Sequence, residues 1–237
     1  VPTAHYLMGG VVVDVETRTS LAGLYVAGED AGGAHGSNRL GGNGVANSTV
    51  YGGIAGDVMA ADAQKMGALH DPDETILDQE LARAIIPFSA KPGNVQELRV
   101  RLMDAMWDDV GVMRDAAGLK LGIEKIASLK TDMENVGISG DNLAFNLSWH
   151  DWLSLQSLID TSEVIAKAGL SRENSRGAHF REDFPDAGSL DDSYFTIATS
   201  GDKGIGVNRE AVKFTIVKPG ESLLGADEAE TLVEAAQ

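Results

Sequence analysis

The sequence predicts a mixed α+β protein in which part of an α/β domain precedes a three-helix bundle and a small C-terminal antiparallel β segment. Three observations support this. Short apolar runs and a glycine-rich loop occupy the beginning of the chain, stripes of apolar residues with helical spacing occupy the middle, and two β-type runs follow near the end. We therefore expect three segments, over residues 1–93, 94–171 and 172–237.

The first segment begins with two runs that are typical of β-strands. GGVVVDV (Gly9–Val15) is rich in β-branched residues, and LAGLYVAGED (Leu21–Asp30) ends in glycine and acids. The polar turn ETRTS between them indicates a hairpin that leads into a buried strand. After the glycine-rich loop, apolar residues recur with helical spacing and predict a helix over about 45–65. Its small residues give it a smooth face for close packing.

The middle segment is predicted to contain three amphipathic helices. HDPDET (70–75) interrupts the preceding pattern, and PFSAKPGN (87–94) marks the expected boundary. Short links between the helices favour an antiparallel bundle. The three apolar stripes comprise Leu98, Leu102, Met106, Val110 and Met113; then Leu119, Ile123, Ile126 and Met133; then Leu143, Leu147, Leu155, Ile159 and Ile165.

The third segment is charged at first and then β-like. SYFTIATS (Ser193–Ser200) and EAVKFTIVKP (Glu210–Pro219) predict two antiparallel strands, and the acidic tail from Glu221 is expected to be solvated. Before them, SRENSRGAHFREDFPD contains a charged cluster that we interpret as a structural ion-pair network. This cluster consists of Arg176, His179, Arg181 and Asp183.

Composition excludes several classes of protein. The formal net charge of −17 disfavours binding to nucleic acid or to an anionic membrane. With no cysteine in the 237 residues, disulfides, thiolate metal sites and cysteine nucleophiles are excluded, and no histidine pair has the spacing of a zinc motif. No apolar run is long enough for a membrane span and no signal peptide is evident, so we expect a cytoplasmic protein. Because the first residue is Val1, we expect a processed chain or a fragment.

The stretch HGSNRLGGNG (35–44) has two interpretations. Glycine is unfavourable in regular structure, so this run marks either a flexible turn or a loop whose backbone approaches a large anionic ligand. In the second case Arg39 would hold another anion. A strand that ends at Glu29, a glycine loop and a helix that starts near Gly44 and Val45 form an arrangement found in many nucleotide sites.

Four motifs give the sequence a specific resemblance. They are HYLMGG, GLYVAGED, HGSNRLGGNGVANS and ENSRGAHFREDFPD, and they occur in this order along most of the chain. Together they resemble the C-terminal part of the succinate dehydrogenase/fumarate reductase flavoproteins, a family that includes L-aspartate oxidase. The family's helical C-terminal domain also corresponds to the three helices expected here.

The resemblance implies roles for five residues. His5 corresponds to a histidine that binds a substrate carboxylate, and Arg39 corresponds to the arginine that grips the dicarboxylate, which suits its planar fork. Glu29 corresponds to an acid that contacts FAD. The backbone amides of Gly44 and Val45 correspond to those that meet the flavin ring.

The chain departs from the family pattern in two ways. Gly44 and Val45 stand where the family usually has serine and leucine, which preserves the backbone amides but loses side-chain contacts. The family's N-terminal G-x-G-x-x-G loop is absent; GDKGIGVN (201–208) lacks the required strand–helix context and is rejected. The capping domain that supplies the proton donor is absent as well. The chain therefore resembles a C-terminal portion with part of an FAD site.

The function implied by the resemblance is hydride exchange between FAD and a small dicarboxylate. Such an enzyme would need the N-terminal FAD and capping portion as a partner. The resemblance also leaves open a peripheral position at a membrane, through an iron–sulfur partner subunit. One alternative is a non-catalytic fragment or subunit that folds and interacts but has no turnover alone. A second alternative is oxidation of an amino acid, as in L-aspartate oxidase.

Overall fold

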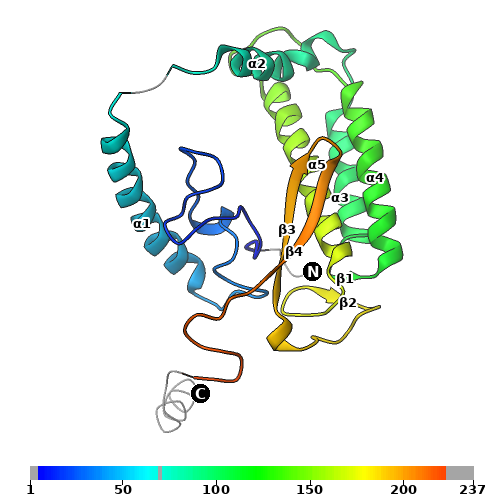
Figure 1. Ribbon diagram of the computed structural model, residues 1–237. Helices are drawn as coiled ribbons and strands as arrows, with labels where there is room; N and C mark the ends of the chain where they lie inside the picture. Colours follow the sequence, from blue (N-terminus) through cyan, green and yellow to red (C-terminus); the bar gives the residue numbers. More distant parts are fainter. Residues whose placement is uncertain (1–4, 69–70, 223–237) are drawn as a thin grey trace.

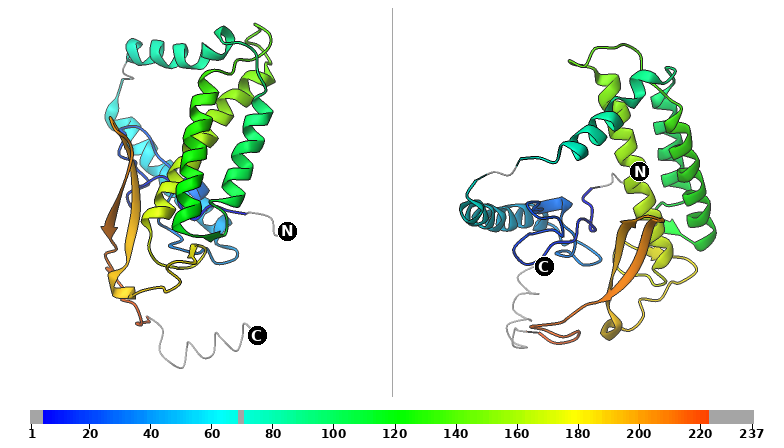
Figure 2. Two further views of the ribbon diagram at one scale, coloured as in Figure 1. Left: turned by 90° about the vertical axis from the view of Figure 1, so that its right-hand side faces the viewer. Right: turned by 45° about the horizontal axis from the view of Figure 1, so that its top comes forward.

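The computed structural model describes residues 5–68 and 71–222, with two groups of elements in space (Figure 1). The N-terminal segment and helix α1 form one group, and helices α3, α4 and α5 form the other. Figure 2 shows the same separation from two further directions. The helices are α1 (Asn43–Met66), α2 (Glu74–Ser89), α3 (Val95–Asp108), α4 (Ala116–Glu134) and α5 (Leu147–Ser171).

The predicted three-helix bundle is confirmed. Side-chain oxygens of Asn94, Asp115 and Asn146 cap the N-termini of α3, α4 and α5, by accepting hydrogen bonds from backbone amides of the first turn. Apolar residues from all three helices form one continuous core, and the burial of each large side chain contributes about 1.5–3 kcal/mol to folding. Buried members of this core on the three helices include Leu98, Leu102, Leu119, Ile126, Leu129, Trp152, Leu155 and Ile159.

Three residues of the predicted stripes lie outside the helices. Helix α3 ends at Asp108, so Val110 belongs to the following turn, where it is still buried. Met113 lies in the short strand β1 (Met113–Arg114) and is exposed. Leu143 precedes α5 and is also exposed. Apolar spacing alone places these residues in the helices, whereas the capping side chains determine where the helices begin.

Helix α2 is not predicted by the sequence patterns. Its N-cap, Asp73, accepts hydrogen bonds from the amides of Thr75 and Ile76 at 2.9 and 3.4 Å. The proline that indicates a boundary, Pro87, lies within the last turn of the helix, and its carbonyl accepts a hydrogen bond from Ile138 at 3.1 Å. Pro87 lacks the amide that would donate to the carbonyl of Arg83, so the helix loses one hydrogen bond there and ends two residues later, at Ser89. The domain boundary at residue 93 stays a prediction.

The strands expected over 9–15 and 21–30 are present only as single bridges. Val11 bridges Ala31 in parallel, and Arg18 bridges Tyr25 in antiparallel orientation; the second run ends in the 3-10 helix η1 (Gly28–Asp30). The antiparallel bridge joins the predicted turn, at Arg18, to the second run, whereas the first run is bridged in parallel, so the two runs do not pair as the predicted hairpin. A β-strand requires a neighbouring strand for its backbone hydrogen bonds, and the described residues supply none along Gly9–Val15.

The C-terminal antiparallel segment is confirmed, with its second strand displaced. Strand β3 (Tyr194–Gly201) pairs with β4 (Gly204–Ala211), whereas the sequence predicts the second strand over 210–219. A two-residue turn joins them, and Gly204 follows it with a φ of 89°. GDKGIGVN therefore forms the turn of the hairpin and the first part of β4, in keeping with its rejection as a phosphate loop. The acidic tail lies mostly outside the described residues.

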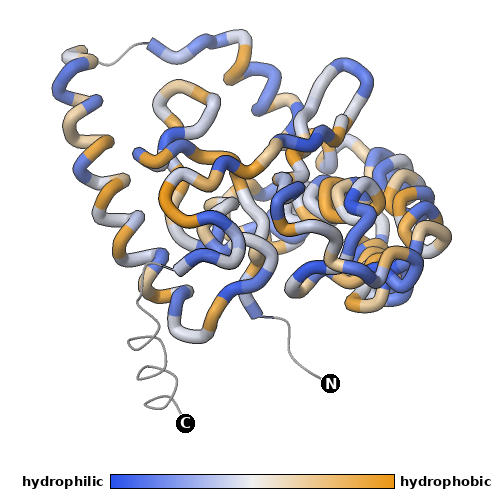
Figure 3. Tube along the Cα trace, turned by 60° about the horizontal axis from the view of Figure 1, so that its bottom comes forward, coloured by the Kyte–Doolittle hydropathy of each residue, from blue (hydrophilic) through white to orange (hydrophobic). Residues whose placement is uncertain are grey.

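Two further features complete the fold. Strand β2 (Phe180–Arg181) pairs with β1 in parallel, and the hairpin β3–β4 lies beside α5 (Figure 1). Along α1, hydrophobic residues alternate with polar ones, and several of the hydrophobic ones remain exposed (Figure 3). Among the described helices, none combines the length and the apolar character that crossing a bilayer requires.

Candidate functional site

The N-terminus of α1 presents backbone amides that no side chain caps. Gly42 occupies the N-cap position with a φ of 85°, a left-handed conformation that suits glycine. Asn43 donates its amide to the carbonyl of Leu40 at 3.2 Å, but the next amides, of Gly44 and Val45, have no acceptor of this kind among the described residues. The helix dipole adds partial positive charge here. This end of α1 is therefore suited to an anionic or carbonyl-rich ligand.

Arg39 lies beside this helix start and stacks on Tyr6. Its guanidinium carbon is 4.6 Å from the centre of the Tyr6 ring, within the range of a cation–π interaction. Nη1 donates to the carbonyl of Leu40 at 3.3 Å, whereas the buried Nε has no hydrogen-bond partner among the described residues. A buried donor without an acceptor is unfavourable, so the position is suited to a ligand that accepts this hydrogen bond.

Gly44 allows the close contact between the helix and the Arg39–Tyr6 pair. A Cβ at this position would lie 2.9 Å from Cε2 of Tyr6 and 3.5 Å from Nη1 of Arg39. The sequence patterns indicate Gly44 only as a source of a backbone amide. The structure adds that its missing side chain leaves room for the tyrosine ring.

Tyr6 and Asn47 are site residues that the sequence reasoning missed. Asn47 is only 5% exposed, and its Nδ2 lies 3.1 Å from the carbonyl of Gly28, 3.3 Å from the Tyr6 hydroxyl and 3.0 Å from Nε2 of His35. Through His35, the same amide holds the glycine loop to α1. No pattern in the sequence singles out Asn47, because one amide within a helix carries no local signal.

His5 and Glu29 flank this network. The exposed ring of His5 lies edge-on to Tyr6, with 6.1 Å between ring centroids. Glu29 accepts a hydrogen bond from the amide of Leu7 at 2.8 Å through Oε1, which ties the histidine segment to η1. The structure therefore brings His5, Arg39 and Gly44 together around one tyrosine, with Glu29 holding the adjacent backbone.

We expect Asn47→Ala to loosen this network. Without the amide, Tyr6, His35 and the carbonyl of Gly28 lose a common hydrogen-bond donor in a buried place, which should lower the free energy of unfolding by about 1–3 kcal/mol. Chemical denaturation of the two proteins measures this difference. Thr49→Ala, at an exposed position of the same helix, is the control and should change stability by less than about 0.5 kcal/mol. Equal stabilities of the two variants would contradict the role of Asn47.

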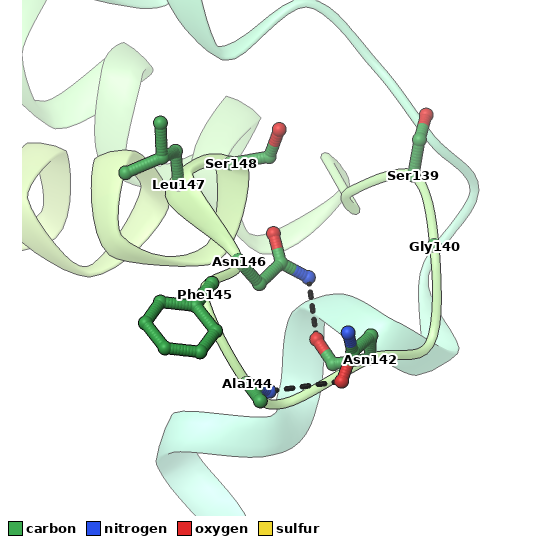
Figure 4. A pocket seen from close by; sticks show the side chains of 8 residues that line it. All are labelled: Ser139, Gly140, Asn142, Ala144, Phe145, Asn146, Leu147 and Ser148. Carbon is green, nitrogen blue, oxygen red and sulfur yellow. Dashed lines mark hydrogen bonds between the residues drawn. The ribbon is translucent and has the colours of Figure 1, made fainter.

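A shallow pocket elsewhere in the chain lacks the chemistry of this site. It has a volume of about 370 Å³ and lies in the connection between α4 and α5 (Figure 4). Asn142 and Asn146 supply its amide groups, and hydrogen bonds within the loop engage several of them. No charged side chain lines it. The lining residues are Ser139, Gly140, Asn142, Ala144, Phe145, Asn146, Leu147 and Ser148.

The charged cluster predicted near residue 180 is centred on a buried arginine. Arg181 has an exposed fraction of 0%, and Nη1 donates to the carbonyls of Gly169, Leu170 and Arg172 at 2.9–3.2 Å. Its other nitrogens donate to Asp183 at 2.7 and 2.8 Å. Hydrogen bonding to Arg181 is the main reason that the pKa of Asp183 falls to about 2. The arginine thus donates hydrogen bonds to the C-terminal carbonyls of α5, and its positive charge interacts favourably with that end of the helix dipole, as expected for a structural network.

His179 belongs to the same structural cluster. Its Nδ1 lies 3.0 Å from Nη1 of Arg114, and its Nε2 lies 3.2 Å from the carbonyl of Arg172. Burial lowers the pKa of His179, and the charges of the neighbouring arginines lower it further, although its backbone hydrogen bond acts in the opposite direction. His179 is therefore held neutral near pH 7.

Comparison with known proteins identifies the family. Residues 99–223 match the family model described as the fumarate reductase flavoprotein C-terminal region, and residues 1–45 match that of the FAD binding domain. The chain belongs to the fumarate reductase flavoprotein family. This result confirms the resemblance carried by the four sequence motifs, and the flavoprotein C-terminal region accounts for the observed mixture of helices and a small antiparallel sheet.

Several curated relatives show how much of a flavoprotein the chain represents. It is 36% identical to a subunit of the fumarate reductase (CoM/CoB) of Methanothermobacter marburgensis and 34% identical to L-aspartate oxidase of Yersinia pestis. Each alignment covers 78% of this chain and 33% of the relative. The fumarate reductase flavoprotein subunit of Haemophilus influenzae is 30% identical over 95% of this chain and 38% of its own length. The chain thus spans a third to two fifths of these relatives.

Solved structures agree with this placement. A chain of E. coli quinol fumarate reductase superimposes with a TM-score of 0.83 at 28% identity, over 92% of this chain and 38% of that chain. A Mycobacterium smegmatis Sdh1 structure in complex with UQ1 gives a TM-score of 0.77 at 32% identity, over 97% of this chain and 39% of that chain. The described elements therefore have the arrangement found in these larger chains.

Proposed function

We propose that this chain forms the substrate-facing C-terminal part of an FAD-dependent oxidoreductase that acts on a small dicarboxylate. The observation that carries the proposal is Arg39, whose buried Nε lacks an acceptor among the described residues while its guanidinium stacks on Tyr6 beside the uncapped start of α1. A carboxylate would supply the missing acceptor and the counter-charge. The family match supports FAD as the cofactor.

The residues at the start of α1 fit the ring portion of FAD. The amides of Gly44 and Val45 have no side-chain cap, and Val45 is 77% exposed. These amides would hold the carbonyl-rich edge of the flavin ring, and Glu29 would accept hydrogen bonds from its hydroxyl-bearing chain. When bound, FAD supplies hydride chemistry that protein side chains lack.

Arg39 and His5 would hold the substrate. The planar guanidinium can pair with one carboxylate through two parallel hydrogen bonds. His5 lies edge-on to the same Tyr6 ring, and its exposed imidazole can donate to a second carboxylate. Fixing both carboxylates orients the carbon between them and thereby reduces the entropy cost of the reaction.

The proposed enzyme needs parts that these residues do not supply. We infer an N-terminal portion that binds the FAD pyrophosphate and supplies the proton donor. We further propose a cytoplasmic location and an iron–sulfur partner subunit, through which the enzyme would lie at the periphery of a membrane. Several relatives are named as flavoprotein subunits, among them one of an 8-methylmenaquinol:fumarate reductase, which supports assembly with other chains.

A second candidate is amino-acid oxidation of the L-aspartate oxidase type. The identity to L-aspartate oxidase is close to that of the fumarate reductase relatives, so sequence similarity favours neither substrate strongly. L-Aspartate also carries two carboxylates, and both would suit the Arg39 and His5 positions. Assaying the FAD-loaded enzyme with succinate, fumarate and L-aspartate in parallel separates the two candidates.

The chain on its own should bind FAD weakly, with a dissociation constant above about 1 µM. A constant of this size corresponds to a binding free energy of about −8.2 kcal/mol. Only the ring side of the cofactor finds partners in these residues, and a dinucleotide also needs a pyrophosphate loop. Calorimetric titration of FAD into residues 1–237 measures the affinity. The same titration with the N-terminal portion present should give much tighter binding. Sub-micromolar affinity for the chain alone would show that its FAD site is more complete than proposed.

A further inference from the structure

The glycine loop that carries Arg39 is in backbone contact with a loop of the C-terminal segment. The carbonyl of Ser37, two residues before Arg39, accepts a hydrogen bond from the amide of Ala178 at 2.9 Å. The preceding Gly177 has a φ of 56° and lies against the same carbonyl. The two loops are 140 residues apart in sequence, and this contact joins the N-terminal group to the C-terminal part of the chain.

Only glycine allows this approach. A Cβ on residue 177 would lie 2.3 Å from the carbonyl oxygen of Ser37 and 2.8 Å from Cβ of Asn38. An ordinary contact would require at least 3.4 Å, so one of the loops would have to move by about 1 Å, a displacement large enough to impair an orienting group.

The Gly177 side of the contact is fixed. Arg176 and His179 exchange two backbone hydrogen bonds, at 2.9 and 3.0 Å, around the turn that contains Gly177. The guanidinium of Arg176 also donates to the carbonyls of Ala187 and Ser189 and to the hydroxyl of Ser193, at 2.5–2.8 Å. Through His179 and the neighbouring Arg181, the loop is attached to the end of α5.

The Ser37 side is more easily displaced. Ser37 itself is flanked only by two turn hydrogen bonds of 3.3 Å, from Gly36 to Gly33 and from Asn38 to His35. The side-chain contact that ties the loop to α1 is made by His35, and residues 36–38 are exposed. A strained contact between the loops would therefore be relieved by movement of the residues that precede Arg39.

We propose that Gly177 and Ala178 are positioning residues for Arg39. They contact the glycine loop that carries Arg39 at Ser37, while Tyr6 stacks on the guanidinium itself. This inference rests on the proposed function in one respect, namely that Arg39 binds a carboxylate of the substrate. It adds that the placement of the arginine depends on the helical part of the chain, through the loop fixed at the end of α5.

The test compares Gly177→Ala with Gly188→Ala. Both glycines have positive φ angles, of 56° and 69°, so alanine is similarly strained at the two positions. The nearest atom to a Cβ on residue 188 is Nη2 of Arg176 at 3.8 Å, an ordinary contact. The control therefore reproduces the backbone strain in the same segment without the collision with Ser37.

Hydrogen exchange on the chain gives the first readout. We expect Gly177→Ala to accelerate amide exchange in residues 36–42 by about tenfold or more, which corresponds to ~1.4 kcal/mol, and Gly188→Ala to leave this segment unchanged. Equal exchange in both variants would overturn the coupling. If Gly177→Ala does not fold, the pair Gly177→Asn and Gly188→Asn replaces it, because asparagine tolerates a positive φ while its Cβ still meets Ser37.

Kinetics of the FAD-loaded enzyme give the second readout. Gly177→Ala should lower kcat/KM for the dicarboxylate by about 10–100-fold and raise the KM for it, with FAD content and the KM for the electron acceptor or donor unchanged. The kcat/KM of Gly188→Ala should stay within about twofold of that of the parent enzyme. If Arg39→Lys lowers activity but Gly177→Ala and Gly188→Ala have equal kcat/KM values, the positioning role fails and the proposed function stands. If Arg39→Lys has no effect, the proposed function itself fails.

Discussion

Replacing Arg39 by lysine in the FAD-loaded enzyme should lower kcat/KM for the dicarboxylate by about 100-fold or more, or ~2.7 kcal/mol of transition-state stabilisation. Lysine keeps the positive charge but loses the planar fork that pairs two nitrogens with one carboxylate. It also loses the buried Nε, which is a donor without a partner among the described residues, and the stack on Tyr6 at 4.6 Å. Steady-state kinetics with the true substrate measure the effect.

FAD content should stay near that of the parent enzyme, because the proposed flavin contacts are the amides of Gly44 and Val45 together with Glu29. Arg209→Lys is the matched control. Arg209 also stacks on a tyrosine, Tyr194, at 4.8 Å, but lies in the hairpin β3–β4, and its replacement should leave kcat/KM unchanged. Unchanged kinetics for Arg39→Lys would remove Arg39 from the site. Loss of FAD would instead mark it as a cofactor or folding residue.

Replacing Arg181 by methionine should lower the free energy of unfolding by about 3–5 kcal/mol, the cost of breaking a buried charged network by removing one partner. Methionine has a similar length and no donor. It would leave the carbonyls of Gly169, Leu170 and Arg172 without their shared donor, and Asp183 without its counter-charge. Urea denaturation of the chain, followed by tryptophan fluorescence, to which the buried Trp152 contributes, measures the change.

An exposed ion pair and the pH dependence provide the controls. Arg101 pairs with Asp132 at 2.7 Å on the surface of the bundle, and Arg101→Met should cost less than about 1 kcal/mol.

Folding lowers the pKa of Asp183 from 3.8 to about 2. The contribution of Asp183 to the stability of the fold is therefore complete above pH 3.8 and is lost as the pH falls through 2. Arg181→Met should reduce this acid dependence. A change no larger than that of Arg101→Met would show that the network contributes little.

The sequence indicated much of the candidate site, though not the residues that hold it together. Arg39, His5 and Gly44 belong to recognisable motifs, and the structure places them around one ring. Tyr6 and its hydrogen-bond partner Asn47 lie within two of the same motifs but received no role from the sequence, since their importance depends on which side chains meet across 41 residues of chain. The roles of His5, Arg39, Glu29, Gly44 and Val45 in binding remain proposals that the kinetic variants test.

The sequence by itself determined the three-helix bundle, helix α1, the first strand of the C-terminal hairpin and the family. These features depend on local periodicity, capping side chains and motifs, which are present in the linear order of residues. Only the tertiary structure decided that the apolar run Gly9–Val15 forms a single bridge rather than a strand, and that Gly177 meets Ser37. A β-ladder and a loop–loop contact each require a second segment, and distant parts of the chain come together only when the whole core has packed.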